Sequence, residues 1–196
     1  MITDFSKSQT KINLMKAFAG ESQARERYTI AASFAAKESL QVIQKAFLTI
    51  ADQEKEHGEI FYKFLKPFSG EGIKFDADYP VDVFDSTLDY LKKASQNETD
   101  EFEDIYDKFA KIAQNEGFAD IAQKFFGIAK IEKTHAEKFK KLAMLLENGE
   151  LFDSKTGRGK WVCMECGNVY EGMSVPKFCP VCGHDRGYFV KNDICF

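Results

Sequence analysis

The chain has 196 residues, of which 44% are hydrophobic and 30% are charged, and this composition excludes both intrinsic disorder and a collagen-like fibre. The net charge is -4, and no basic arm or stripe indicates a nucleic acid or a membrane as a partner. The first ten residues are polar, and no apolar run reaches the roughly 18 residues that span a bilayer. We therefore expect a soluble, cytoplasmic protein.

Two long stretches, residues 1–66 and 81–175, lack proline and are rich in helix-forming residues. They predict four helices in two hairpins: Lys7–Lys37 with Leu40–Phe64, and Ser86–Asn115 with Phe118–Glu147. The joint at residues 66–85 contains two prolines and two glycines and is long enough to cross a bundle from end to end. The expected fold is an all-α, ferritin-like four-helix bundle with one long crossover.

The two hairpins look like copies of each other. A shift of 78 positions pairs Glu54 with Glu132 and His57 with His135, together with several apolar neighbours. A bundle of two related hairpins has approximate two-fold symmetry, so whatever one Glu-x-x-His pair does is expected again from the opposite side. Two symmetric half-sites indicate two identical metal ions.

Each predicted helix places one glutamate on its apolar face. Glu54 and Glu132 each lie on a stripe of phenylalanine, isoleucine and alanine, Glu21 has similar neighbours, and Glu98 shares a face with Leu91, Ala94, Phe102 and Ile105. Burying one ionised carboxylate costs several kcal/mol, and converging carboxylates also repel one another. Bound cations remove this conflict, so the stripes predict a metal site inside the bundle.

One Glu from each of two helices plus a Glu-x-x-His from each of the other two is the ligand set of ferritin-like di-iron and di-manganese proteins. The expected ligands are Glu21, Glu54, His57, Glu98, Glu132 and His135. Glu101 lies at the edge of the same stripe and is an optional seventh ligand. Tyr28 and Tyr106 lie near the acids, either as ordinary core tyrosines or as hydrogen-bond donors to ligand carboxylates.

After residues 151–159, a glycine-containing linker, come two Cys-x-x-Cys-Gly knuckles. Their cysteines are Cys163, Cys166, Cys179 and Cys182. This spacing predicts one tetrahedral four-thiolate site, and spacing alone leaves both zinc and iron open. His184 and Cys195 lie outside the knuckles and are expected not to bind metal. The predicted domains are thus a bundle at 1–150 and a metal-dependent module at 160–196.

With both sites in view, the chain resembles the rubrerythrin family from end to end. The residues that carry the resemblance are the segment from Ala19 to Arg25 with Tyr28, the Glu and His positions of all four helices, Tyr106, and the knuckles introduced by Trp161 and Val162. Asp107 departs from the proline that many relatives have after this tyrosine, which is expected to alter the helix locally without touching a ligand.

The resemblance implies ligand roles. Glu54 and Glu132 bridge two irons, Glu21 is terminal on one, and Glu98 with His135 is terminal on the other. His57 and Glu101 alternate as ligands of the first iron as its oxidation state changes. The four cysteines hold a third iron, with zinc as a possible substitute.

The resemblance also implies an activity, the two-electron reduction of hydrogen peroxide to water in oxidative-stress defence. Electrons come from NADH through rubredoxin or an NAD(P)H-dependent rubredoxin reductase, then through the rubredoxin-like iron to the di-iron site. A separate reductase is needed because this chain has no glycine-rich dinucleotide motif. Relatives are homodimers in which the small domain of one subunit serves the di-iron site of the other.

Three alternatives remain open at this stage. A ferroxidase or oxygen reductase would use the same di-iron ligands with dioxygen. An iron-storage protein would assemble into a cage of bundles, for which the cysteine module has no evident use. A structural bundle with a zinc-ribbon adaptor would not be an enzyme at all.

Overall fold

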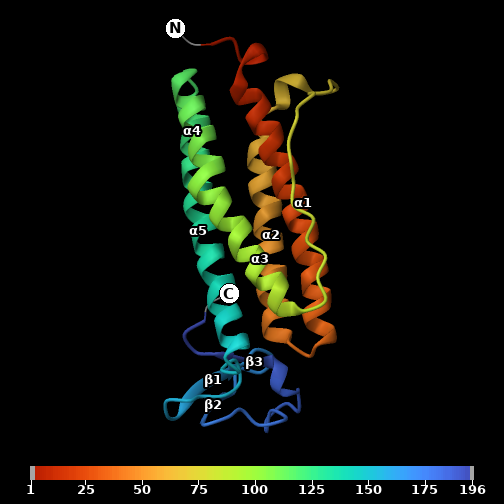
Figure 1. Cartoon of the computed structure of the whole chain (residues 1–196), viewed down its shortest axis with the longest axis vertical. Helices are drawn as coiled ribbons and strands as arrows, with labels where there is room; N and C mark the ends of the chain where they lie inside the picture. The colour runs from red at the N-terminus through yellow and green to blue at the C-terminus, as the bar shows by residue number, and fades with distance from the viewer. Residues whose placement is uncertain (1–2, 195–196) are drawn as a thin grey trace.

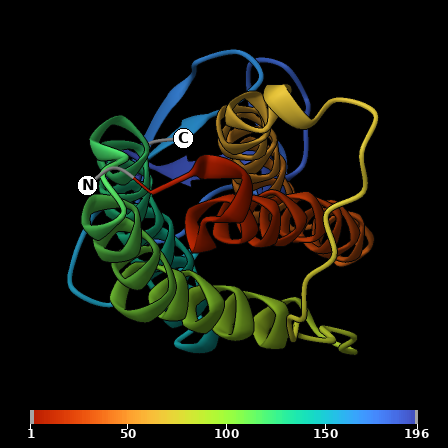
Figure 2. The same ribbon diagram turned by 90° about the horizontal axis from the view of Figure 1, so that it is seen from above.

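The computed structural model describes residues 3–194, and it has a helical bundle with a small strand domain at one end (Figure 1). The five α-helices are α1 (Gln9–Lys37), α2 (Gln41–Phe64), α3 (Thr87–Asp100), α4 (Tyr106–Asn115) and α5 (Ala119–Glu147). α1 packs along α2, while α3 and α4 together pack along α5. Seen along the bundle, the two hairpins face each other (Figure 2). The predicted ferritin-like bundle is confirmed.

The starts of α1 and α3 are each capped by a serine side chain. Ser8 Oγ accepts a hydrogen bond from the Lys11 amide at 3.0 Å, and Ser86 caps α3 in the same manner. The Glu116 carboxylate accepts from the amides of Gln9 and Thr10 at 2.9 and 2.8 Å. Because Glu116 follows α4, these bonds tie the start of the first hairpin to the corner of the second.

The crossover between the hairpins runs beside α1 along the bundle (Figure 1). Asp82, in this segment, accepts from Arg27 on α1 at 2.6 Å and from Asn97 on α3 at 2.8 Å. Tyr79 donates its hydroxyl to the Lys16 carbonyl at 2.9 Å. These contacts hold an otherwise irregular segment against both hairpins.

The bundle core consists of two hydrophobic clusters rather than one. One cluster contains Phe47 and Phe139 and reaches the small domain, and the other contains Phe61 and Phe125 at the opposite end. The two Glu-x-x-His pairs lie between these phenylalanines in the sequence of α2 and α5. A polar layer therefore divides the core in two.

The third predicted helix is interrupted. α3 ends before a single π turn, Glu101–Ile105, and α4 begins at Tyr106. A π turn holds more residues than an α-helical turn, so it rotates the residues that follow around the helix axis. Ile105, predicted to share the buried face with Glu98, is 38% exposed, and Tyr106 is buried instead. The prediction of an unbroken helix over Ser86–Asn115 is wrong by one inserted residue.

The π turn also explains how the internal repeat continues through this helix. Before the turn α1 matches α3 at a shift of 77, which pairs Leu14 with Leu91, Ala17 with Ala94 and Glu21 with Glu98. After the turn the shift is 78, which pairs Tyr28 with Tyr106, Ala32 with Ala110 and Ala35 with Ala113. The inserted residue therefore lies between the acid and the tyrosine of the second half. The Asp107 carboxylate accepts from Lys111 at 2.5 Å and belongs to neither donor group of the bundle.

The small domain is a three-stranded antiparallel sheet with the order β2-β1-β3. The strands are β1 (Gly159–Cys163), β2 (Val169–Gly172) and β3 (Phe189–Lys191). Its own core centres on Trp161, whose indole N–H donates to the Leu151 carbonyl at 3.1 Å. Leu151, Val190 and Ile194 join the bundle core, so the two parts share a hydrophobic boundary.

No helix within residues 3–194 combines the length and the apolar character needed to cross a membrane.

Candidate metal centres

Six side chains of the polar layer converge at the middle of the bundle. Their donor atoms form two groups, each with all its atoms within 4.8 Å of one another: Glu21, Glu54, His57 and Glu132; and Glu54, Glu98, Glu132 and His135. All six residues are buried. Glu54 and Glu132 belong to both groups, so the layer has the arrangement of two adjacent cation positions that share two carboxylates.

Both histidines turn Nδ1 toward the carboxylates. His57 Nδ1 lies 3.0 Å from an oxygen of Glu54 and 3.0 Å from an oxygen of Glu132. His135 Nδ1 lies 2.8 Å from Glu132 and 3.1 Å from Glu54. The two rings are nearly parallel, with centroids 5.8 Å apart.

Six of these buried atoms form no hydrogen bond of normal geometry, although several lie within 3.1 Å of a histidine Nδ1 or a carboxylate oxygen. They are Glu21 Oε2, Glu54 Oε1, Glu98 Oε2, both oxygens of Glu132, and His135 Nδ1. Buried polar atoms are almost always satisfied, and six of the thirteen unpartnered buried side-chain atoms among residues 3–194 belong to this one layer. Their lone pairs face a common centre, so oxygen and imidazole donors fit two divalent cations such as iron or manganese.

The pKa values show the strain of this layer without cations. Burial, reinforced by neighbouring carboxylates, raises the pKa of Glu21 well above its usual range and that of Glu98 to about 8. Burial also raises the pKa of Glu54, but contacts with both histidines outweigh it and bring the value to about 2. Burial lowers the pKa of His135, yet its carboxylate partners raise it to about 12. A bound cation would replace the proton that these groups otherwise share.

Two tyrosines donate to the carboxylates, as the sharper of the two sequence interpretations expects. Tyr28 on α1 donates its hydroxyl to Glu98 on α3. Tyr106 on α4 donates to Glu21 on α1 at 2.5 Å. Each hairpin therefore orients the single acid of the other, and both tyrosines are buried.

Glu101 lies outside both four-atom groups. It is half-buried at the start of the π turn and lines a cavity of about 290 Å³ under the crossover, together with Arg27, Tyr79 and Tyr106. Burial and the other carboxylates raise its pKa, and Arg27 partly opposes them. The lining includes Tyr106, which donates to Glu21, but none of the six converging residues.

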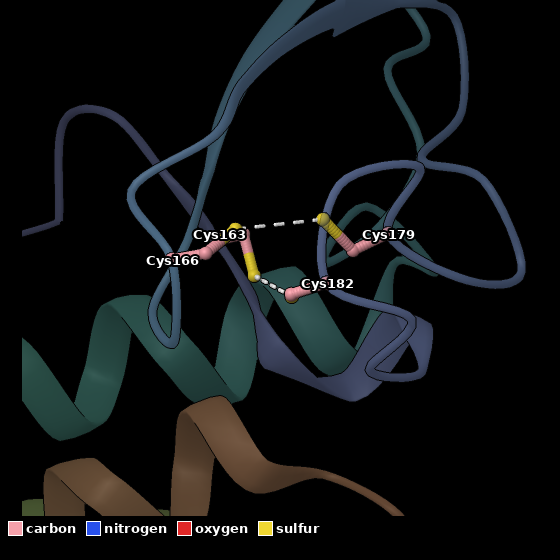
Figure 3. Close-up of side chains that lie close together, drawn as sticks. All are labelled: Cys163, Cys166, Cys179 and Cys182. Carbon is pink, nitrogen blue, oxygen red and sulfur yellow. Dashed lines mark hydrogen bonds between the residues drawn. The ribbon is translucent and has the colours of Figure 1, made fainter.

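The four knuckle cysteines are free thiols that point toward one another (Figure 3). Two sulfur pairs, Cys163 with Cys182 and Cys166 with Cys179, are each 3.7 Å apart. Metal–sulfur bonds of about 2.3 Å in a regular tetrahedron place sulfurs about 3.8 Å apart. The cysteines therefore fit one tetrahedral ion.

The amides of Asn168, His184 and Val181 donate to Cys166, Cys182 and Cys179 respectively. Burial raises the pKa of Cys179, but backbone amides and neighbouring sulfurs outweigh it and lower the pKa to about 6. The amides lower the pKa of Cys166 and Cys182, but burial and the other cysteines outweigh them and raise the pKa, to about 12 for Cys182. The knuckle glycines Gly167 and Gly183 have φ of 74° and 77°, a backbone conformation that residues with a Cβ atom rarely adopt. Each glycine lets the chain turn so that these amides face the sulfurs.

Two further residues, His184 and Cys195, were predicted not to bind metal. His184 packs against Tyr188, with ring centroids 4.7 Å apart, and belongs to no donor group within residues 3–194. Cys195 lies outside the described residues.

Sequence reasoning missed Gln53, whose Oε1 lies 2.9 Å from His135 Nε2. The signal was available in the repeat, because the residue before Glu132 is Ile131 whereas the residue before Glu54 is Gln53.

The fold and the two donor sets define a ferritin-like metal-binding bundle with a small four-cysteine domain. The family model described as rubrerythrin matches residues 13–143, and that of the rubrerythrin rubredoxin-like domain matches residues 161–190. The chain belongs to the rubrerythrin family.

Individual relatives agree with this assignment. Rubrerythrin of Clostridium perfringens is 45% identical over 183 residues, which cover 93% of each chain. Rubrerythrin of Porphyromonas gingivalis is 41% identical over 182 residues, 93% of this chain and 89% of that one. Among solved structures, nigerythrin matches with a TM-score of 0.63 at 23% identity, over 96% of this chain and 92% of that chain, which supports the fold.

Proposed function

We propose that the protein is a non-haem di-iron peroxidase that reduces hydrogen peroxide to water. The observation that carries this proposal is the presence of two different donor sets on one chain, buried carboxylates with imidazoles and a four-thiolate group. The first set suits a cation pair that reacts with an oxidant, and the second suits a one-electron carrier. Family membership supports the combination.

The proposed ligands follow the convergence of the side chains. Glu54 and Glu132 would bridge two irons, Glu21 and His57 would complete one, and Glu98 and His135 the other. Glu101 would exchange with His57. Cys163, Cys166, Cys179 and Cys182 would hold a third iron, and zinc fits the same four sulfurs.

Two adjacent ferrous ions would supply one electron each, which gives peroxide the two electrons that its O–O cleavage requires. The residues would prepare this reaction. The tyrosines hold Glu98 and Glu21 in place, and the cavity beside Glu101 admits a small oxidant under the crossover. Phenylalanine clusters on both sides exclude bulk water from the polar layer.

The four-cysteine domain would return electrons, one at a time and twice per turnover. It contacts the bundle at the start of α2, where Gly187 approaches Gln41, and at α5, where Asp193 accepts from Lys141 at 2.8 Å. In line with the family resemblance, the protein would be a homodimer in which the small domain of one subunit serves the other subunit's bundle.

Rubredoxin or an NAD(P)H-dependent rubredoxin reductase is the proposed donor to the four-thiolate iron, with NADH as the source of electrons. We place the protein in the cytoplasm, where a reducing environment keeps the four thiols free to bind metal.

Stopped-flow mixing of the fully reduced protein with hydrogen peroxide and, separately, with dioxygen tests the proposal. We expect peroxide to oxidise the bundle site faster. Faster oxidation by dioxygen would support a ferroxidase or oxygen reductase instead. An iron-mineral core in a cage of about 24 subunits would support storage. A colourless tail, without thiolate-to-iron bands that bleach on reduction, would support the zinc-ribbon adaptor.

A further inference from the structure

The two histidines of the polar layer are held differently although the hairpins repeat. His135 uses both ring nitrogens, with Nδ1 facing Glu54, Glu98 and Glu132, and Nε2 at 2.9 Å from Gln53 Oε1. For His57, every hydrogen-bond or ion-pair contact among residues 3–194 reaches Nδ1. Among the described residues, the His135 ring is therefore held at both nitrogens and the His57 ring at Nδ1 alone.

The amide oxygen of Gln53 can only accept, so the close contact requires a proton on His135 Nε2. A neutral imidazole with a proton on Nε2 has its lone pair on Nδ1, the atom that faces the carboxylates. Gln53 therefore selects the tautomer in which His135 is ready to bind a cation. Its own side chain is otherwise exposed on α2 and contributes little to the core.

The repeat shows that this support is present in one half only. At the shift of 78 that relates α2 to α5, Gln53 corresponds to Ile131, a residue that cannot accept a hydrogen bond and is 40% exposed. The matching support for His57 would have to come from Ile131. His57 thus lacks its counterpart because of a single residue difference between the halves.

A second difference between the two repeats concerns the position of Glu101. At the shift of 77 that relates α1 to α3, Glu101 corresponds to Ala24, which is buried and has no donor atom. Glu101 lies in the second hairpin and lines the same cavity as Tyr106, whose hydroxyl donates to Glu21 of the His57 donor group. Ala24, its counterpart in the first hairpin, offers no carboxylate to the His135 donor group. The His135 group therefore has a supporting hydrogen bond from Gln53, and the His57 group has an additional carboxylate nearby.

We propose that Gln53 is a positioning residue that keeps His135 as a permanent ligand, while Ile131 leaves His57 free to depart. The inference rests on the proposed di-iron function and adds to it the residue pair that decides which histidine is exchangeable. It requires no contact between Gln53 and the metal or the oxidant, because Gln53 acts only through the His135 ring.

The test uses the full chain loaded with Zn²⁺, a diamagnetic probe of both sites. Gln53→Leu removes the acceptor, Gln53→Glu retains one, and Gln44→Leu is the matched control on the same helix. The first measurement is zinc transfer to a chromophoric chelator, with release from the four-cysteine site as an internal reference. The second is the NMR signal of the His135 Nε2 proton.

We expect Gln53→Leu to release bundle zinc at least about 10-fold faster and to lose the protected Nε2 proton signal. Gln53→Glu should keep the signal and restore most of the retention, and neither variant should change release from the cysteines. Unchanged release in Gln53→Leu, or equal losses in Gln53→Leu and Gln53→Glu, would overturn the inference. If the unmodified protein showed no bundle zinc at all, the proposed di-metal site itself would fail, which is a distinct result.

Discussion

The two metal centres differ in what holds them together. The bundle site draws its donors from four helical segments that are far apart in the sequence, and two large hydrophobic clusters surround it. The cysteine site draws all its donors from two short knuckles, and its cluster has five buried residues. Only Trp161 and Phe189 among them are large, and both are fully buried.

This difference predicts opposite relations between metal and folding. A core as extensive as that of the bundle can fold without ions and then hold its acids under strain. A core as small as that of the cysteine domain depends on its ion for stability. The buried carboxylates that would bind metal destabilise the metal-free bundle, whereas the small domain needs its metal ion in order to fold.

The largest expected effect is therefore on the small domain. Cys179→Ser, or complete metal removal, should unfold it, because a structural ion in such modules contributes about 10–16 kcal/mol. Trp161 is the only tryptophan and is fully buried, so its fluorescence reports this loss, while far-UV circular dichroism reports the bundle. Cys195→Ser is the matched control. A red-shifted Trp161 with unchanged helicity is expected, and a Trp161 that stays buried in the metal-free protein would contradict the comparison.

The next effect concerns pH and the metal-free bundle. Burial with neighbouring carboxylates raises the pKa of Glu98 to about 8, and contacts with Glu132 and Glu54 outweigh burial and raise that of His57 to about 9. The folded state therefore holds protons that the unfolded state releases at lower pH, so stability falls as pH rises between about 5 and 9.

Denaturant unfolding followed by circular dichroism at several pH values measures this trend. The metal-loaded bundle should change much less over the same range, because cations rather than protons then balance the carboxylates. Equal pH dependence with and without metal would show that the acid layer is not where the cations bind.

A smaller effect is expected from Tyr106→Phe, which removes the hydroxyl that donates to Glu21 and leaves that buried oxygen without a partner. Metal affinity of the bundle should fall about 10-fold, with the fold retained. Tyr62→Phe is the matched control because Tyr62 is 52% exposed. Chelator competition measures both variants, and equal affinities would remove Tyr106 from the account.

The sequence was sufficient for the four-helix plan because apolar periodicity and proline placement are local signals. It was also sufficient to select the acids, since Glu54 and Glu132 interrupt apolar stripes where burial of a charge is costly. It did not reveal the π turn at Glu101–Ile105, because an inserted residue leaves no mark on composition and only shifts the phase. The repeat did contain that information, in the change from 77 to 78 between Glu98 and Tyr106.

Contacts between the two hairpins were harder to predict from the sequence. The sequence placed Tyr28 and Tyr106 near the acids without deciding whether they donate to them, since that depends on how the helices cross. The crossover contacts of Asp82 join residues from three segments, and periodicity within one helix gives no information about them.

The central claim is that the two centres form one electron relay to peroxide. Its most direct test compares the protein with iron at both centres to the same protein with zinc in the four cysteines and iron in the bundle, since zinc preserves the fold but carries no electrons. Supplied with NADH and a rubredoxin reductase, the first should reduce many equivalents of hydrogen peroxide. The second should be oxidised once and then stop. Sustained turnover with zinc in the cysteines would contradict the relay.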